Sequence, residues 1–458
     1  MRQFYDRFMK ECQGYFCRLP RRVPVQRYFF IPAPSAGILR AAGNFGSIMK
    51  IIHTSDWHLG QFFYSRSRAR EHQAFLDWLL AQITLHQVNA LIVAGDIFDT
   101  GSPPSYAREM YNHFVVELQK TGCRLVILAG NHDSVAMLNE SRELLACLNT
   151  RVIASASPDG EDQLVVLKDA QDLPAAILCA IPYLRPRDIQ LSQAGLDSQQ
   201  KQQNLLQAIA DHYRHCYQAA LRLRETLGDP SLPIIATGHL TALGVSKSDS
   251  VRDIYIGTLD AFPASAFPPA DYIALGHIHR PQQVGGQPHI RYSGSPIALS
   301  FDESSTEKSV CLVEFSPQSA PVITQLPIPC VQPLKTLKGS LAEIEQQLDL
   351  LTPLAGAPPV WLDIEVTQQE YLSDLQQRVE ALIEGRPAEV LLLRRSRNST
   401  TTGIARETNE TLNELTAEEV FLRRLSREEA LPEEEQQRLL TLFLQTLELV
   451  RDAGTENE

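Results

Sequence analysis

Five short apolar stretches of this chain stop abruptly at residues that can bind a metal ion. They read KIIHTSDWHLG, NALIVAGDIFD, CRLVILAGNHD, LPIIATGHL and DYIALGHIH. Each is short and rich in β-branched residues, as buried strands are. Helical patterns separate the early stretches, and this alternation predicts an α/β fold with a largely buried sheet and right-handed crossovers.

The polar residues that follow these predicted strands indicate one shared site. In open α/β sheets, ligands gather beyond the carboxyl ends of the strands, so we expect these side chains to meet at one edge. Glycine precedes several of them, at Gly95, Gly130, Gly238 and Gly276, where a missing side chain lets the backbone approach an ion closely. A single strand histidine is more often a core residue, so the prediction depends on the whole set. The candidates are Asp56, His58, Asp96, Asp99, Asn131, His132, Asp133, His239, His277 and His279.

The spacing of two of these pairs suggests how they reach the same site. Asp56 and His58 are two residues apart, as are His277 and His279. In an extended chain both members of such a pair face the same side, so we expect each pair to point together toward the site.

Composition limits the class of protein. A chain of 458 residues is expected to form two or three units. No stretch approaches the ~20 apolar residues of a membrane span. The net charge of −12 argues against nucleic-acid binding by bulk attraction alone. The scattered cysteines, several of them in apolar runs, favour buried free thiols in a reducing cytoplasm over a disulfide framework.

The first 48 residues differ in composition from the remainder. They carry eight Arg or Lys and two Asp or Glu. Two hypotheses compete for this segment: an Arg-rich targeting segment, or upstream sequence translated ahead of a start at Met49. We favour the second because a predicted strand begins directly at Met49, and we expect residues 1–48 to lie outside the fold.

The order of the motifs D-x-H, G-D-x-x-D, G-N-H-D, G-H and G-H-x-H resembles that of the calcineurin-like metallophosphoesterases. Longer segments, including GDIFDTGSPPSYA and LAGNHDSVAMLNESR, are similar to the SbcD-like nuclease family within that superfamily. The resemblance extends from about Met49 to the C-terminus. It implies a β-sandwich flanked by helices, with a small α+β capping domain and a C-terminal helical hairpin.

The resemblance also implies two divalent metal ions with a shared ligand. Mixed carboxylate, amide and imidazole ligands suit Mn²⁺, which the family resemblance implies as well, although iron and zinc fit the same ligand types. One ion is expected to bind Asp56, His58 and His279, the other Asn131, His239 and His277, and Asp96 is expected to bridge them.

The reaction implied by the resemblance is phosphodiester hydrolysis of DNA, as a 3′→5′ exonuclease on duplex ends and an endonuclease on hairpin and single-stranded DNA. The ribose oxygen leaves poorly unless it is protonated, and His132 is the candidate general acid. Asp99 and Asp133 are expected to orient histidines or anchor the turn. An alternative interpretation with equal support is that Asp99 and Asp133 are ordinary Asx-turn residues.

Contacts to DNA are assigned to Arg66, Arg68 and Arg70, which follow the first candidate metal loop. A solvated charged face is the alternative interpretation of these arginines. Because basic clusters are few, we expect DNA affinity to come partly from a partner.

Beyond the nuclease domain, placed at 49–330, a βαβ-like pattern predicts the capping domain at 331–397, where PPVWLDIEV alternates as a half-buried strand. Residues 398–458 read as a linker and two helices whose broad apolar surface suggests partner docking, or a hairpin folded onto its own domain. The resemblance implies an SbcC-type coiled-coil ATPase as partner and a homodimer within a heterotetramer, in the cytoplasm. A phosphatase with the same metal core and a non-enzymatic scaffold are the competing functions.

Overall fold

The computed structural model describes residues 48–157, 160–189, 197–251, 261–351, 358–367 and 375–395, together with Phe443. The opening segment and the expected C-terminal helical hairpin lie outside these residues, so the expectations for them remain predictions. No helix among the described residues is both long and apolar enough to cross a bilayer. The described cysteines are free thiols, and four of them are buried: Cys123, Cys179, Cys216 and Cys311.

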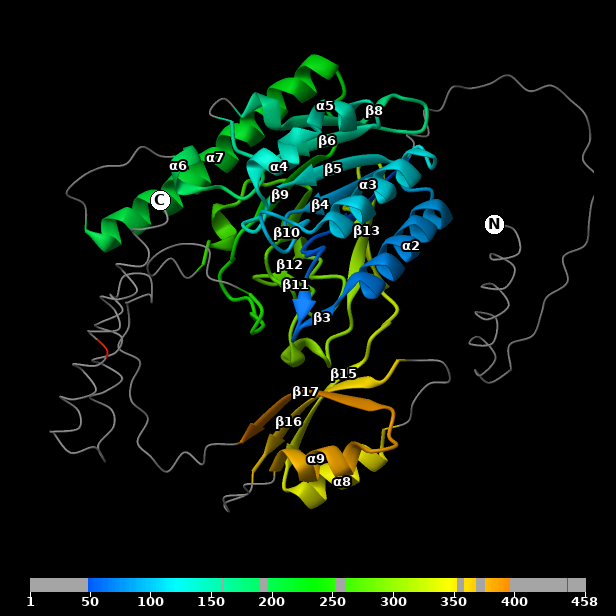
Figure 1. The fold of residues 1–458 in the computed structure, drawn as a ribbon. Helices are drawn as coiled ribbons and strands as arrows, with labels where there is room; N and C mark the ends of the chain where they lie inside the picture. The colour runs from blue at the N-terminus through cyan, green and yellow to red at the C-terminus, as the bar shows by residue number, and fades with distance from the viewer. Residues whose placement is uncertain are drawn as a thin grey trace, which may run out of the picture. The chain divides into compact units, whose positions relative to one another are not determined.

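The first sheet has six strands, of which β1, β4, β5 and β6 are parallel and β13 and β14 continue it antiparallel. In spatial order it contains β14 (Val322–Pro327), β13 (Ser309–Phe315), β1 (Met49–Thr54), β4 (Ala90–Ala94), β5 (Arg124–Leu128) and β6 (Thr150–Ile153). Helices α2 (Ala69–His86) and α3 (Ser105–Gln119) pack on it through residues such as Phe75, Leu79 and Phe114. The short helices α4 (Val135–Glu140) and α5 (Arg142–Ala146) follow β5 (Figure 1).

The second sheet is also mixed, because β12, β10, β9 and β8 run parallel while β11 and β7 pair antiparallel at its edges. In spatial order it contains β11 (Gln282–Val284), β12 (Gln287–Tyr292), β10 (Tyr272–Gly276), β9 (Ile234–His239), β8 (Pro174–Cys179) and β7 (Leu164–Lys168). The long helix α7 (Ser198–Leu227) packs on this sheet through Ile209, Tyr213 and Cys216. Short helical turns are η1 (Glu161–Gln163), α6 (Pro186–Ile189), η2 (Ala264–Ala266) and η3 (Phe301–Glu303).

The two sheets share one apolar core. Ile51, Ile92 and Leu128 from the first sheet pack with Leu178 and Ile235 from the second. Burial of these side chains between two layers is the main source of stability for such a sandwich. The structure therefore confirms the predicted α/β arrangement of two mixed sheets flanked by helices, and the strands that end in candidate ligands come from both sheets.

A smaller C-terminal sheet contains β15 (Leu334–Gly339), β16 (Val360–Val366) and β17 (Ala388–Arg395), all parallel. Helices α8 (Leu341–Asp349) and α9 (Leu375–Ile383) pack on one face of it. The capping domain was expected to be of the α+β type; its three strands are instead all parallel and alternate with helices in the order β-α-β-α-β. Sequence patterns missed β15 because its exposed polar residues interrupt the apolar run.

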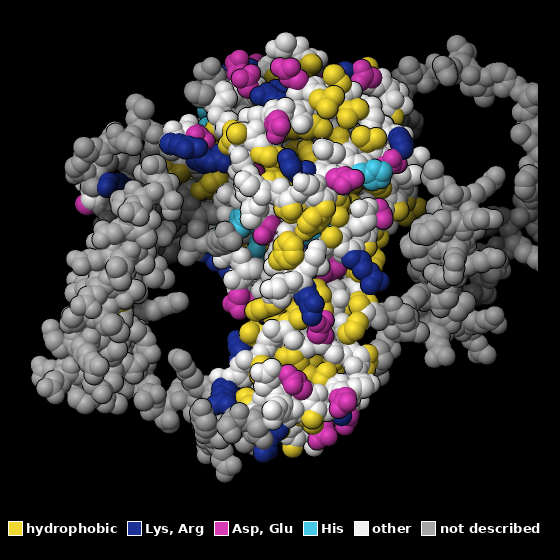
Figure 2. All heavy atoms as spheres, viewed as in Figure 1, with side chains coloured by type: hydrophobic (Ala, Val, Ile, Leu, Met, Phe, Trp, Pro, Cys, Tyr) yellow, Lys and Arg dark blue, Asp and Glu magenta, His cyan; other side chains and the backbone are white. Residues whose placement is uncertain are grey.

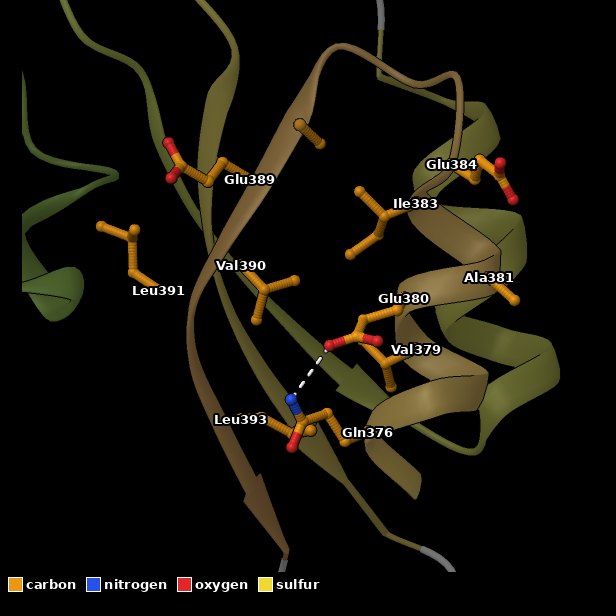
Figure 3. Close-up of a pocket in the computed structure, with 11 residues that line it drawn as sticks. Gln376, Val379, Glu380, Ala381, Ile383, Glu384, Glu389, Val390, Leu391 and Leu393 are labelled. Atoms are coloured by element: carbon orange, nitrogen blue, oxygen red, sulfur yellow. Dashed lines mark hydrogen bonds between the residues drawn. The ribbon is translucent and has the colours of Figure 1, made fainter. Parts of the chain in front are cut away.

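Figure 3 shows a hollow between α9 and β17, into which Val379, Ile383 and Val390 project.

The second face of this small sheet contacts a hairpin of the larger part of the chain, made of β2 (Phe62–Phe63) and β3 (Arg66–Ser67). The rings of Phe63 and Trp361 stack with centroids 6.0 Å apart. Asp363, which the alternating pattern predicts on an open face, is buried and pairs with Arg394. The strand β16 is therefore covered on both faces. The alternation of apolar and polar residues in its sequence does not predict this, because the cover comes from a distant part of the chain.

Candidate metal centre

The backbone bends sharply where the candidate ligands follow their strands. Asp56, His58 and Asp96 have φ angles of 53°, 48° and 51°, in the left-handed region that non-glycine residues rarely adopt. Such strain persists only where surrounding contacts enforce it. Here the Asp56 amide donates to the Gly95 carbonyl and the His58 amide to the Asp96 carbonyl, each at 3.0 Å. The expected extended geometry is therefore replaced by a bent backbone that hydrogen bonds to the loop after β4.

Two glycines allow the loops to approach one another. A Cβ atom on Gly95 would lie 2.2 Å from Nδ1 of His239, and one on Gly130 would lie 2.1 Å from Oδ1 of Asp96. Both distances are far shorter than any real contact, so a side chain at either position would displace a candidate ligand. The glycines make room for the ligand side chains themselves.

The predicted ligands gather in three overlapping groups. Within each group the ligand atoms lie within 4.8 Å of one another. The groups are Asp56, His58 and His279; His58, Asp96 and His132; and Asp96, His239 and His277. Asp96 belongs to two of these groups, so its carboxylate lies close both to His58 and His132 and to His239 and His277. The two histidines after β10 separate, His277 toward one group and His279 toward another.

Asn131 joins the group that contains His239 and His277. Its Oδ1 lies 2.9 Å from Nε2 of His239 and 3.2 Å from Nδ1 of His277. This neutral oxygen therefore faces the same space as two imidazoles without adding negative charge. The structure thus brings together every residue that the sequence predicts as a ligand.

Hydrogen bonds on the outer nitrogens fix how the imidazoles face the site. Nδ1 of His239 donates to the Ala94 carbonyl at 2.9 Å, and Nδ1 of His58 lies 3.1 Å from Oδ1 of Asp99. Nε2 of His58 is buried with no hydrogen-bond partner among the described residues, and it lies 3.6 Å from Oδ2 of Asp96. A buried polar atom without a hydrogen bond is costly, so this nitrogen is suited to be a metal ligand.

The electrostatics of the group are dominated by Asp96. Burial alone would raise the pKa of this carboxyl, but the His239, His58 and His132 side chains hold its pKa well below the usual range. Burial opposes the charged form of His239, yet the Asp96 carboxylate outweighs it and raises the pKa of His239 to about 9. For His277, burial followed by the charge of His239 lowers the pKa well below its ordinary value. The site therefore concentrates negative charge on Asp96, where a cation would be favoured.

The two outlying carboxylates differ in position. The Asp133 carboxylate accepts backbone N–H groups from Gly130 at 2.8 Å, Phe98 at 3.1 Å and Ile97 at 3.2 Å. These hydrogen bonds connect the loop after β4 to the loop after β5, and all three donors are backbone amides. Asp99 instead faces His58, so of these two it is the carboxylate placed to orient a histidine.

His132 belongs to the group with His58 and Asp96 and is held from both ends. Its backbone amide donates to Oδ1 of Asp96 at 2.9 Å, and its Nδ1 lies 2.7 Å from the carbonyl oxygen of Asp99. Its ring packs edge-on against His58 with centroids 4.7 Å apart. The imidazole is only half-buried, so it borders the space from which a substrate would arrive.

The three arginines proposed for DNA contact occupy different environments. Arg68 is buried, pairs with Glu71 and donates to the Ala298 carbonyl at 2.8 Å. Arg66 is exposed and pairs with Glu389 of β17. Arg70 is exposed on α2. Because the guanidinium of Arg68 is buried and bonded to Glu71 and Ala298, it is not accessible to a DNA phosphate in this structure.

Sequence patterns missed a buried network behind His279. Glu303 in η3 is fully buried and pairs with Lys308 at 2.6 Å. Ser250 lies 2.6 Å from Nδ1 of His279 and 2.5 Å from Glu303. Burial alone would raise the pKa of Glu303, but the hydrogen bond with His279 and the charge of Lys308 hold that pKa far below its ordinary value. No strand-end pattern precedes these residues, so the sequence carries no signal for them.

Comparisons with known proteins bear on this site. Residues 49–281 match the family described as calcineurin-like phosphoesterase, and residues 330–429 match the one described as type 5 capsule protein repressor C-terminal domain. The chain is 60% identical over 399 residues to SbcD, the nuclease component of SbcCD, from Escherichia coli K12, and the match covers 87% of this chain and 98% of that protein.

More distant relatives carry the same name. The SbcD nuclease of Rhodobacter capsulatus is 32% identical, covering 74% of this chain and 85% of that protein. The SbcD nuclease of Bacillus subtilis is 31% identical, covering 71% of this chain and 81% of that protein. The resemblance therefore includes both the sandwich with its ligand groups and much of the C-terminal sequence.

Proposed function

The chain belongs to the calcineurin-like phosphoesterase family, within its SbcD nucleases, and we propose that it hydrolyses DNA phosphodiesters with two Mn²⁺ ions. The observation that carries this proposal is a chain of three ligand groups, of which the first two share His58 and the last two share Asp96. The proposed reactions are 3′→5′ exonuclease action on duplex ends and endonuclease action on hairpin and single-stranded DNA.

The ligand assignment follows the groups. Asp56, His58 and His279 would hold one ion, and Asn131, His239 and His277 would hold the other, with Asp96 between them. Nε2 of His58 supports this assignment because it is buried without a hydrogen bond among the described residues and lies 3.6 Å from Oδ2 of Asp96. For His277, Nδ1 is the nitrogen that faces Oδ1 of Asn131, at 3.2 Å. The mixture of oxygen and imidazole ligands supports manganese.

The protein's own residues would carry the proton transfer. Two bound divalent ions would supply positive charge to the phosphate and lower the pKa of a water molecule. His132 would donate a proton to the leaving ribose oxygen from Nε2, since its Nδ1 hydrogen bonds to the Asp99 carbonyl. Asp99 would orient His58, and Asp133 would hold the two loops in register.

DNA affinity would come partly from a partner. On the face drawn in Figure 2, basic and acidic side chains of the described residues are interspersed and form no broad basic surface. Since the net charge is −12, electrostatic attraction by this chain alone is weak. We propose an SbcC-type coiled-coil ATPase as that partner, in a heterotetramer containing two copies of this chain in the cytoplasm, with Arg70 and Arg66 as the DNA contacts nearest the site.

The domain assignment accompanies this proposal. We propose a nuclease domain at 49–330, a capping domain at 331–397 that governs which strand reaches the metals, and a partner-docking region at 398–458. Residues 1–48 would lie outside the fold.

The test is a cleavage assay on end-labelled duplex and hairpin DNA with Mn²⁺, with and without the co-purified ATPase and ATP. We expect shortening from the 3′ end and hairpin opening, both abolished by chelation. A protein that hydrolysed a small phosphomonoester rapidly but left both DNA substrates intact would be a phosphatase instead, and the proposal would fail. A protein with neither activity would leave the scaffold hypothesis standing.

A further inference from the structure

A buried polar network surrounds the side of His279 that faces away from the other ligands. Nδ1 of His279 lies 2.6 Å from the hydroxyl of Ser250 and 3.4 Å from Oε1 of Glu303. His279 and Glu303 are both buried, and Ser250 is half-buried. The three residues come from the loop after β10, from η3 and from the chain after β9, so the contact depends on the tertiary fold.

The donors around Glu303 leave its carboxylate fully occupied. Oε1 accepts from the hydroxyls of Ser250 at 2.5 Å, Ser248 at 2.7 Å and Ser300 at 3.1 Å. Oε2 accepts from Nζ of Lys308 at 2.6 Å and from the Leu299 amide at 3.1 Å. A carboxylate held by this many donors is fixed in position and presents only acceptor atoms to its neighbours.

This arrangement sets the direction of the hydrogen bonds. Because ionised Glu303 only accepts, the hydroxyl hydrogen of Ser250 points to Glu303, and the oxygen of Ser250 is left to accept from Nδ1 of His279. The hydrogen of His279 then sits on Nδ1, and Nε2 keeps its lone pair for the group formed with Asp56 and His58.

Lys308 fixes the backbone of the same residue. Its Nζ donates to the carbonyl oxygen of His279 at 2.9 Å and to Ser295 at 2.9 Å, in addition to Glu303. The backbone and the ring of His279 are therefore both attached to the Glu303–Lys308 pair. Other predicted ligands are oriented differently: His58 by Asp99 and His239 by a backbone carbonyl.

We propose that Ser250 and Glu303 are positioning residues that fix the ring orientation and tautomer of His279 for metal binding. The proposal rests on the proposed function, since it assumes that His279 is a metal ligand. Ser250 and Glu303 touch neither the substrate nor the metal in this scheme and act only through His279.

The primary test is Ser250→Ala in the full chain, with Mn²⁺ binding measured by calorimetry. Partners of this kind typically change metal affinity by roughly 10- to 100-fold, and we expect a loss of that size at one of two sites. Ser250→Thr keeps the hydroxyl and should restore the affinity. Ser246→Ala, on the same loop but exposed and not bonded to Glu303, is the matched control and should bind as wild type does.

Glu303→Gln provides a second variant, although it leaves the buried Lys308 charge without its partner and can cost folding stability. Thermal melting of each metal-free variant separates the two effects. A positioning role predicts that Ser250→Ala melts within a few degrees of wild type without metal but gains less from added Mn²⁺. It also predicts that saturating Mn²⁺ restores cleavage by this variant.

The outcomes separate this proposal from the proposed function. If Ser250→Ala bound both ions with wild-type affinity, or if Ser250→Thr failed to restore binding, the positioning role would be overturned while wild-type cleavage stood. If the wild type bound Mn²⁺ but cut no DNA, the nuclease function would fail and the calorimetry would still decide the role of Ser250. A wild type that bound no Mn²⁺ would overturn both.

Discussion

Nδ1 of His132 lies 2.7 Å from the backbone carbonyl oxygen of Asp99. A carbonyl oxygen only accepts hydrogen bonds, so Nδ1 of His132 carries a hydrogen and Nε2 is the atom that can exchange a proton with a substrate. The same residue's amide donates to Asp96 at 2.9 Å. The neighbouring Asn131 instead turns its amide oxygen toward His239 and His277. Adjacent residues are therefore oriented for different tasks.

We expect His132→Ala to keep its metal and lose DNA cleavage. The substitution removes the proposed acid but leaves the backbone amide that bonds to Asp96. General acid catalysis contributes roughly 10²- to 10⁴-fold, so cleavage should fall by that factor while Mn²⁺ affinity changes little. Calorimetry and single-turnover cleavage measure the two quantities. His113→Ala, an exposed histidine on α3, is the control. Normal cleavage by His132→Ala would exclude the acid role.

Asp96→Asn should affect both metal sites at once. The Asp96 carboxylate belongs to two ligand groups, and neighbouring histidines hold its pKa well below the usual range, which favours the charged form that attracts a cation. We expect Mn²⁺ binding at both sites to be lost, as measured by calorimetry and by the rise in melting temperature on adding Mn²⁺. Asp99 lies against the outer nitrogen of His58, so Asp99→Asn should weaken binding by roughly 10- to 100-fold. Retention of both ions by Asp96→Asn would exclude the bridging role.

The strand ends of the site could be predicted from sequence because their signals are local. An apolar run followed by glycine and a polar residue is complete within a few positions, and parallel strands bring such ends to one edge. The bent backbone at Asp56 and His58 could not be predicted, because it depends on hydrogen bonds to the loop after β4. The two-residue spacing correctly predicted that Asp56 and His58 lie together, but it predicted an extended backbone, and the backbone is bent there.

Residues whose role depends on distant partners escaped prediction. Nothing within the segment RSRAR distinguishes Arg68 from its neighbours, yet its guanidinium bonds to Ala298, far along the chain. Glu303 is likewise unremarkable in sequence, since its partners Ser248 and Ser250 lie more than fifty residues earlier in the chain. Trp361 is buried against Phe63 of the hairpin, and Asp363 is buried with its partner Arg394. Such contacts are set by the tertiary fold and leave no periodic pattern.

Arg68→Ala and Arg70→Ala should separate stability from DNA binding. Removing Arg68 leaves Glu71 buried without its partner, and breaking a buried ion pair costs about 3–5 kcal/mol of unfolding free energy. Arg70 is exposed, so its removal should leave stability within about 0.5 kcal/mol of wild type. If Arg70 contacts a phosphate, the salt dependence of DNA affinity should fall by about one unit of slope. Urea unfolding and DNA binding at several salt concentrations measure both, and an unchanged slope would remove Arg70 from the interface.

Acid should destabilise the protein through His53, which is fully buried and lies 2.9 Å from the Tyr272 hydroxyl. Burial lowers the pKa of His53 from 6.5 to about 3. Between these values the unfolded chain binds a proton that the folded chain does not, so stability is full above pH 6.5 and is lost as pH falls toward 3. The slope is about 1.4 kcal/mol per pH unit for one such group. His53→Gln keeps a polar group near Tyr272 but cannot titrate. In urea unfolding with a chelator at about pH 7 and about pH 5, wild type should therefore lose more stability than His53→Gln, and equal losses would show that His53 is not the titrating group.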